Sequence, residues 1–200
     1  MCIHLTFEYK KAAQCLNYFA IQEGGKINKM KALKLVYFAD RYHLRKYGRP
    51  ITNDEYFAME YGPVPSNVRD ICEMNDSQFG SFEKDYYARF LSSIDQYEYR
   101  SASALDTDVL SASDLEALEI SWKTFGAKNQ YELADIAHKY PEWLKHQEML
   151  KTSPRIRMNL EDFLADSGIE PVLCWSLTPD DRTDRIEQLK ENSHIESLWR

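Results

Sequence analysis

The sequence lacks the local motifs from which many nucleotide and hydrolase sites are built. Its seven glycines form neither G-x-G-x-x-G nor G-x-x-x-x-G-K-[ST], the loops that hold phosphates in two large enzyme classes. Neither H-E-x-x-H nor G-x-S-x-G occurs, so the signatures of zinc peptidases and α/β-hydrolases are also missing. These absences favour a binding protein over an enzyme, and we expect no catalytic residues and no cofactor.

Cysteine is scarce and scattered. Cys2, Cys15, Cys72 and Cys174 form no C-x-x-C pair. Metal sites need clustered ligands, so we expect no bound metal. Four isolated cysteines are typical of a reducing compartment, where they stay free and mainly buried.

Long apolar runs are absent. The longest uncharged apolar stretch, LVYFA at 35–39, is far shorter than the segment that crosses a bilayer. No apolar run follows the first residues either, so we expect no signal peptide, no membrane contact and a cytoplasmic location.

Acidic residues are nearly missing from one region of an acidic chain. The net charge is −7, yet residues 26–49 hold eight cations against Asp40 alone. The cations are Lys26, Lys29, Lys31, Lys34, Arg41, Arg45, Lys46 and Arg49. This pattern fits a solvated face around a buried helix, a positive surface for an acidic protein partner, or a nucleic-acid contact. The overall negative charge argues against nucleic acid.

Apolar residues are concentrated in the same region. Residues 29–47 are predicted as a helix whose middle, ALKLVYFAD, is apolar nearly all round, which indicates a helix enclosed by others. Asn28 is suited to cap its start, and Gly48 followed by Pro50 is typical of a helix end. A first helix within 7–24 carries an apolar stripe and ends at two glycines.

The rest of the chain predicts short helices and a few strands. We expect strands near 56–61 and 96–103, paired with each other, and helices at 67–74, 113–125, 130–140 and 159–167. Ser113 with Glu116 has the spacing of a capping box. The fold class is therefore mainly α (α+β): a compact helical domain, residues 1–178, around a central buried helix, with a small β-sheet or hairpin. Residues 179–200 form a charged tail that is either frayed or helical.

Two acid–histidine pairs were weighed as catalytic groups. His43 follows Asp40 by three residues, and His138 follows Asp135 in the same way, which places each pair on one helix face. Such pairs are common on amphipathic helices, so buried, hydrogen-bonded histidines are the simpler interpretation. Nothing in the sequence supplies a base for Cys72.

The run KALKLVYFADRYHLRKYGRPITNDEYFAMEYGPVPSNVRDI resembles the Panacea domain, the family of SocA-like antitoxins and phage-associated GepA-like proteins. The matching positions are Lys31, Lys34, Leu35, Tyr37, Phe38, Ala39, Gly48, Pro50, Ile51, Phe57, Tyr61, Gly62, Pro63 and Val64. LSASDLEALEISWKTFG and LADIAHKYPEW are similar to the second half of the family. The likeness extends from about residue 16 to residue 143, and the tail shows no family pattern.

The resemblance implies an antitoxin of a toxin–antitoxin system that neutralises its cognate toxin by direct protein binding. SocA-like members instead act as adaptors that deliver the toxin to a ClpXP-type protease. An enzyme that uses His43 or His138, and DNA binding for autoregulation, stay open as other classes. We expect the partner contacts at Lys31, Lys34, Arg41, Tyr61, Gly62, Pro63, Val64 and Trp143.

The segment Tyr61–Val64, here called the corner, is predicted to be rigid. Proline fixes its own φ and restricts the residue before it, whereas glycine tolerates the conformation that remains. We expect the corner to be an exit from a strand into the helix after Pro65. It serves as a fold-defining turn, as an edge presented to the toxin, or as the wall of a small-molecule pocket.

Overall fold

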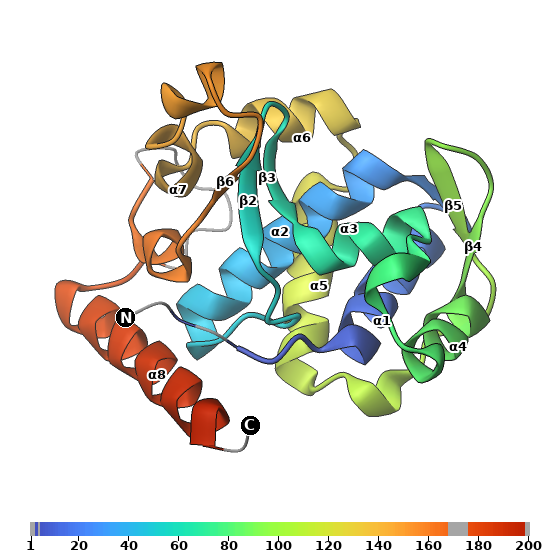
Figure 1. Cartoon of the computed structure of the whole chain (residues 1–200), viewed down its shortest axis with the longest axis horizontal. Coiled ribbons are helices and arrows are strands. Elements are labelled where there is room, and N and C mark those ends of the chain that lie inside the picture. Colours follow the sequence, from blue (N-terminus) through green and yellow to red (C-terminus); the bar gives the residue numbers. More distant parts are fainter. Residues whose placement is uncertain (1–2, 4, 168–175, 199–200) are drawn as a thin grey trace.

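A computed structural model of the chain describes residues 3, 5–167 and 176–198. Its helices are α1 (Tyr9–Gln22), α2 (Lys29–Tyr47), α3 (Ser66–Glu73), α4 (Ser81–Phe90), α5 (Ala112–Phe125), α6 (Gln130–Ala137), α7 (Pro141–Leu144) and α8 (Pro179–Leu198). Its strands are β1 (Lys26–Asn28), β2 (Tyr56–Met59), β3 (Gly62–Pro65), β4 (Leu91–Ser93), β5 (Glu98–Ser101) and β6 (Ile156–Arg157). The predicted class, mainly helical with a small antiparallel β component, is confirmed (Figure 1).

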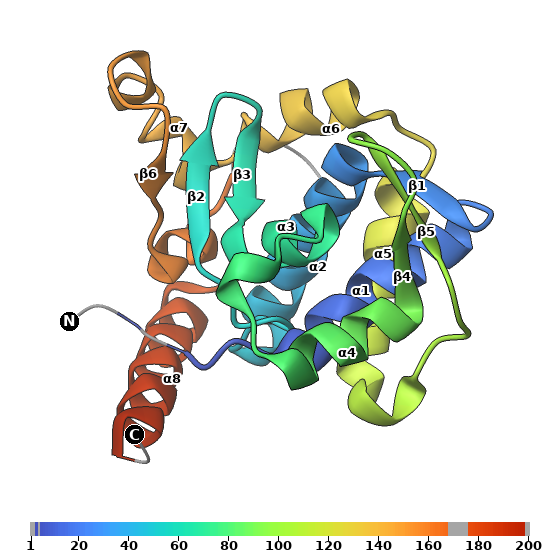
Figure 2. The same ribbon diagram turned by 45° about the vertical axis from the view of Figure 1, so that its right-hand side comes forward.

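Helix α2 is the centre of the fold, as predicted. The Asn28 side chain accepts a hydrogen bond from the Lys31 amide, and Gly48 ends the helix in the left-handed conformation, with φ of 78°. Every residue from 31 to 45 is buried. Helix α2 packs against α1, α3, α5, α6 and β3, and Figure 2 shows these elements around it. A helix enclosed on all sides has no solvent face, which explains its apolar sequence.

Two small antiparallel sheets replace the single predicted pairing. One sheet has the order β1-β5-β4, and the other has the order β3-β2-β6. The strand predicted at 96–103 therefore exists as β5, but its pairing with residues 56–61 was wrong. The Asp95 carboxylate accepts hydrogen bonds from the amides of Tyr97 and Glu98 and so fixes a tight turn between β4 and β5. Pairing across this short turn costs less loop entropy than pairing with β2.

The corner is the start of a strand rather than an exit from one. Gly62–Pro65 forms β3, which returns antiparallel to β2 with Pro63 opposite Ala58. Strand β3 lies at the edge of its sheet, where the missing amide of proline costs no ladder hydrogen bond. Helix α3 follows directly. The Asp54 carboxylate caps α3, because it accepts hydrogen bonds from the amides of Asn67 and Val68.

Three further elements differ from the prediction. Helix α5 begins at Ala112, one residue earlier than expected, because Ser111 forms the capping box with Asp114 in place of Ser113 with Glu116. Helix α4 was not predicted. The helix expected at 159–167 is a short 3₁₀ segment, η4 (Leu160–Leu164).

The C-terminal segment forms a docked helix. Of the helix α8 residues, only Leu189 and Ser193 are buried. Arg185 donates to the Lys46 carbonyl, at 2.6 Å, and Arg182 pairs with Asp166, at 2.8 Å. Figures 1 and 2 show α8 at the lower edge of the molecule, near the C-terminal end of α2. The division of the chain at residue 178 therefore coincides with the start of a peripheral helix.

Within the described residues, no helix combines the length and apolar character needed to cross a membrane. Cys15 and Cys72 are buried free thiols, as expected, and Cys2 and Cys174 lie outside the described residues.

Candidate functional site

A groove of about 830 Å³ lies at one end of α2. It is lined by the first turns of α2, the hairpin β2–β3, α3, the turn between β4 and β5, and the segment that follows α7. We call it the apolar groove, because its lining includes Met30, Leu33, Tyr61, Val64, Trp143 and Leu150. Figures 1 and 2 both show the hairpin tip and the N-terminal end of α2 at the same end of the molecule.

The corner forms part of this groove. Two of its residues line the groove and the other two are buried against α2. Tyr61 is 52% exposed and Val64 is partly exposed, and both line the groove. Gly62 and Pro63 are buried against α2. Gly62 has a φ of 97°, a conformation that a residue with a side chain rarely adopts. The corner is therefore a rigid support that holds an exposed tyrosine at the mouth of the groove.

Trp143 closes the other side. Its indole Nε1 donates to the Met59 carbonyl, at 3.0 Å, which joins α7 to the end of β2. Its ring stacks on His138, with 4.0 Å between ring centroids. Burial lowers the pKa of His138, although a hydrogen bond with the Glu60 backbone acts in the opposite direction. The tryptophan is nearly covered, so it serves the groove as a wall.

Lys34 lies at the floor of the groove and is only 1% exposed. Its Nζ donates to the Pro63 carbonyl, at 2.7 Å, and no carboxylate of the described chain pairs with it. Burial without a counter-ion lowers the pKa of Lys34 to about 7. A buried ammonium group next to apolar side chains is the most unusual electrostatic feature of the groove.

The other two predicted cations lie away from the groove. Lys31 pairs with Glu23, at 2.6 Å, and donates to the Gly126 carbonyl. Arg41 is 1% exposed, bonds the Glu142 carboxylate at 2.6 Å, and sits over the Tyr140 ring. With Lys34 and Arg45 also buried, four of the eight cations of the basic run lie inside the fold. The charge count could not show this, because the carboxylates that neutralise Arg41 and Arg45 lie more than 100 residues away.

Asp40 and His43, the first of the two candidate acid–histidine pairs, have separate partners. Asp40 accepts hydrogen bonds from the Ile51 amide and the Tyr56 hydroxyl and makes no bond to His43. His43 instead contacts the Arg49 carbonyl, at 2.6 Å, and Asp114, at 3.2 Å. Burial lowers the pKa of His43 to about 4, so its buried ring is neutral at pH 7. The described residues contain no cluster of three metal-ligating side chains.

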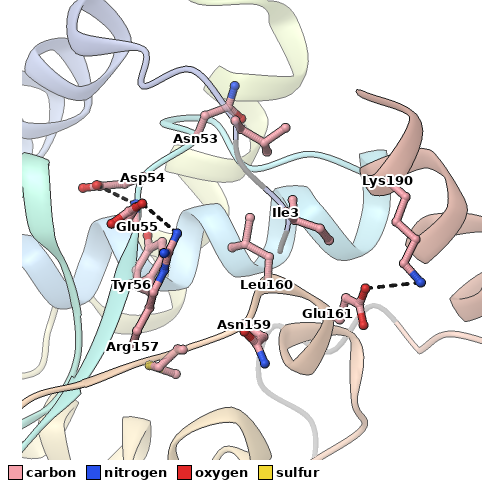
Figure 3. A pocket seen from close by; sticks show the side chains of 12 residues that line it. Ile3, Asn53, Asp54, Glu55, Tyr56, Arg157, Asn159, Leu160, Glu161 and Lys190 are labelled. Carbon is pink, nitrogen blue, oxygen red and sulfur yellow. Dashed lines mark hydrogen bonds and ion pairs between the residues drawn. The ribbon is translucent and has the colours of Figure 1, made fainter. Parts of the chain in front are cut away.

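A second, polar cavity of about 410 Å³ lies between the N-terminal segment, the loop before β2, and η4 (Figure 3). Arg157 pairs with Glu55, at 2.7 Å, and Lys190 of α8 pairs with Glu161, at 3.4 Å. Burial raises the pKa of Asp54 to about 7, but its oxygens are occupied by the amides of α3. The charged groups of this cavity thus pair with one another or accept hydrogen bonds from the backbone of the fold.

Sequence reasoning identified four residues that the structure brings together, namely Lys34, Tyr61, Val64 and Trp143. It missed Met30, Leu33 and Leu150. A helix that is apolar all round does not indicate which of its residues lie beside a groove, so Met30 and Leu33 carried no signal.

The comparisons with known proteins give one match. The family model described as "Antitoxin SocA-like, Panacea domain" matches residues 33–144. No curated protein and no solved structure shows detectable similarity to the chain. The matched residues include α2 from Leu33 onward, the corner and Trp143, but not α8. A match over more than half of the sequence, in agreement with the motifs in α2 and the corner, shows that this chain belongs to the SocA-like antitoxin family with a Panacea domain.

Proposed function

We propose that the chain is an antitoxin that neutralises a cognate toxin by direct binding, and that the toxin docks in the apolar groove. The observation that carries this proposal is the position of the groove. It contains the exposed Tyr61, held by a rigid corner, and most of its wall belongs to the part of the chain that matches the family. A preformed surface loses little conformational entropy on binding.

The energetics of protein interfaces support the same surface. Exposed tyrosines near a buried tryptophan are the residue types that dominate binding energy in interfaces. Tyr61 and Tyr97 both line the groove and are more than half exposed, so both lose solvent contact when a partner enters. The cations of α2 contribute little to steering, because four of the six are buried and three of these four already pair with carboxylates.

The test uses the reading frames adjacent to the gene of this chain. Each reading frame is induced with and without the chain, and growth is measured. The two proteins are then co-purified, and calorimetry of the isolated pair measures their affinity. We expect one neighbour to be toxic, and we expect the full-length chain to restore growth and to bind it. Toxicity from neither neighbour, or rescue without any complex, would contradict direct neutralisation.

Matched tyrosine substitutions place the docking site. Tyr61→Ala is expected to weaken toxin binding about tenfold or more, as for an interface hot spot. Tyr131→Ala is the control, because Tyr131 is 61% exposed on α6 and does not line the groove. If both variants bind the toxin equally well, the toxin docks elsewhere.

A protease adaptor is the second candidate, and one observation favours it. Helix α8 lies outside the matched family region and buries only two of its side chains, so it can be removed or grasped without opening the core. In that case, deletion of residues 179–200 leaves toxin binding intact but stops degradation of the toxin by a ClpXP-type protease. Continued degradation would exclude this role for α8.

A further inference from the structure

The cation at the floor of the apolar groove lacks a counter-ion. The Lys34 ammonium group has three protons, and the described chain offers it one acceptor, the Pro63 carbonyl. An ionised group buried without a carboxylate costs folding free energy, and this cost is not offset within the described chain. The Lys34 ammonium group therefore has hydrogen-bond donors that no residue of the described chain uses.

Lys34 lines the groove although its side chain is almost fully covered. Gly62 lies over it, and a Cβ at that position would stand 3.2 Å from Nζ and 3.4 Å from the Ala137 side chain. A side chain at position 62 would therefore crowd the ammonium group, and glycine avoids this. His138, from the end of α6, adds a second unused group, because its Nε2 is buried and has no hydrogen-bond partner in the described residues.

The charges at the mouth of the groove are mixed. Arg69 pairs with Glu73, at 2.8 Å, and Lys151 pairs with Glu148, at 2.6 Å. Glu60 is exposed at the turn of the hairpin and adds negative charge. A polyanion such as a nucleic-acid backbone needs a broad basic surface, which the mouth does not supply. A single carboxylate that enters among apolar side chains matches one buried ammonium group.

We propose that the apolar groove binds a segment of a protein partner that places apolar side chains on both sides of one carboxylate, which pairs with Lys34. The carboxylate is that of Asp or Glu, or the C-terminal group of the partner. The inference rests on the proposed function for the identity of the partner. It adds the chemistry that the partner must present.

The test selects ligands without assuming a toxin. Random short peptides are displayed on phage in two formats, with the C-terminus fused or free, and are selected on the full-length chain. Binders to the Tyr61→Ala chain are removed. We expect enriched sequences in which apolar residues flank Asp or Glu, or precede a free C-terminus, so the two formats distinguish the two sources of the carboxylate. Enrichment of neutral internal peptides, or no enrichment over the Tyr61→Ala chain, overturns the inference.

A mutant cycle then locates the contact. In an enriched peptide, Asp→Asn, or amidation of a free C-terminus, is expected to weaken binding about tenfold or more to the wild-type chain and less than about twofold to Lys34→Met. Lys31→Met is the matched control, because Lys31 is a buried lysine of the same helix that already has a carboxylate partner. Equal weakening in the wild-type and Lys34→Met chains overturns the inference. Circular dichroism and the thermal transition verify that each variant is folded.

The two proposals fail in different ways. If a toxin binds through Tyr61 but its affinity is the same for Lys34→Met, the antitoxin proposal stands and the carboxylate inference is wrong. If no neighbour is toxic but acidic peptides bind through Lys34, the groove chemistry stands and the proposed partner is wrong.

Discussion

Two buried cations on helix α2 lie two turns apart and are treated differently by the fold. Arg41 is neutralised by Glu142, at 2.6 Å, and is covered by the Tyr140 ring. Lys34 is equally buried and is held by one neutral carbonyl. An arginine with its own carboxylate is a completed structural contact, whereas a solitary lysine beside a groove is an incomplete one. The comparison separates the part of α2 that builds the core from the end that lines the apolar groove.

The largest expected effect comes from breaking the completed pair. Glu142→Gln leaves the Arg41 charge buried without a counter-ion, and we expect the free energy of unfolding to fall by about 3–5 kcal/mol. Urea denaturation monitored by circular dichroism measures the loss. Glu148→Gln is the control, because Glu148 forms an exposed ion pair with Lys151 and such pairs contribute little. Similar losses for the two variants would mean that Arg41 does not depend on Glu142.

Removal of the Lys34 charge is expected to raise the free energy of unfolding. Lys34→Met replaces the buried ammonium with an apolar side chain of similar length, and we expect the free protein to gain about 1–4 kcal/mol near pH 6. The protein would thus carry a destabilising residue where it contacts a partner. Denaturation of both proteins by urea gives the difference, and a lower stability of Lys34→Met would indicate that the bond to Pro63 dominates.

The stability that Lys34→Met gains should decrease as the pH rises. Burial lowers the pKa of Lys34 from 10.5 to about 7. The cost of the charge is fully present below about pH 7, where both states are protonated, and it shrinks as pH rises toward 10.5, because only the unfolded state still binds the proton. The advantage of Lys34→Met should therefore be smaller near pH 9 than near pH 6. An advantage that is constant between these pH values would place the Lys34 pKa outside this window.

The smallest effect concerns the space above Lys34. Gly62→Ala and Gly24→Ala both force alanine into a left-handed conformation, with φ of 97° and 94°, at a cost of about 1–3 kcal/mol each. A Cβ at Gly24 meets nothing within 4 Å, whereas one at Gly62 crowds Lys34. We expect Gly62→Ala to be less stable than Gly24→Ala by about 1 kcal/mol. Equal thermal transitions would show that the Lys34 side chain moves aside freely.

Local signals in the sequence were sufficient for the elements that depend on near neighbours. The start of α2 at Asn28, its end at Gly48 and its complete burial follow from a capping side chain, a glycine and an uninterrupted apolar pattern. The strand at β2 and the helix after Pro65 were also predicted. Helix α4 was missed, because its two buried residues, Tyr86 and Tyr87, are adjacent and give no helical period.

Predictions failed where the deciding contact is distant in sequence. Residues 96–103 pair with β1 and β4, and the cap of α3 comes from Asp54, outside the helix. Arg41 and Arg45 of the basic run are buried against carboxylates that only folding brings near. Charge counts along a chain contain no information about such partners.

The sequence by itself determined the central helix, the rigidity of the corner and membership of the antitoxin family, because each depends on residues within a short stretch or on an ordered motif. Only the tertiary structure decided that Arg41 has a carboxylate and Lys34 has none, and that Tyr61, Val64 and Trp143 meet around that lysine. The physical reason is that burial and charge pairing are properties of neighbours in space, and neighbours such as Arg41 and Glu142 are 101 residues apart in the sequence.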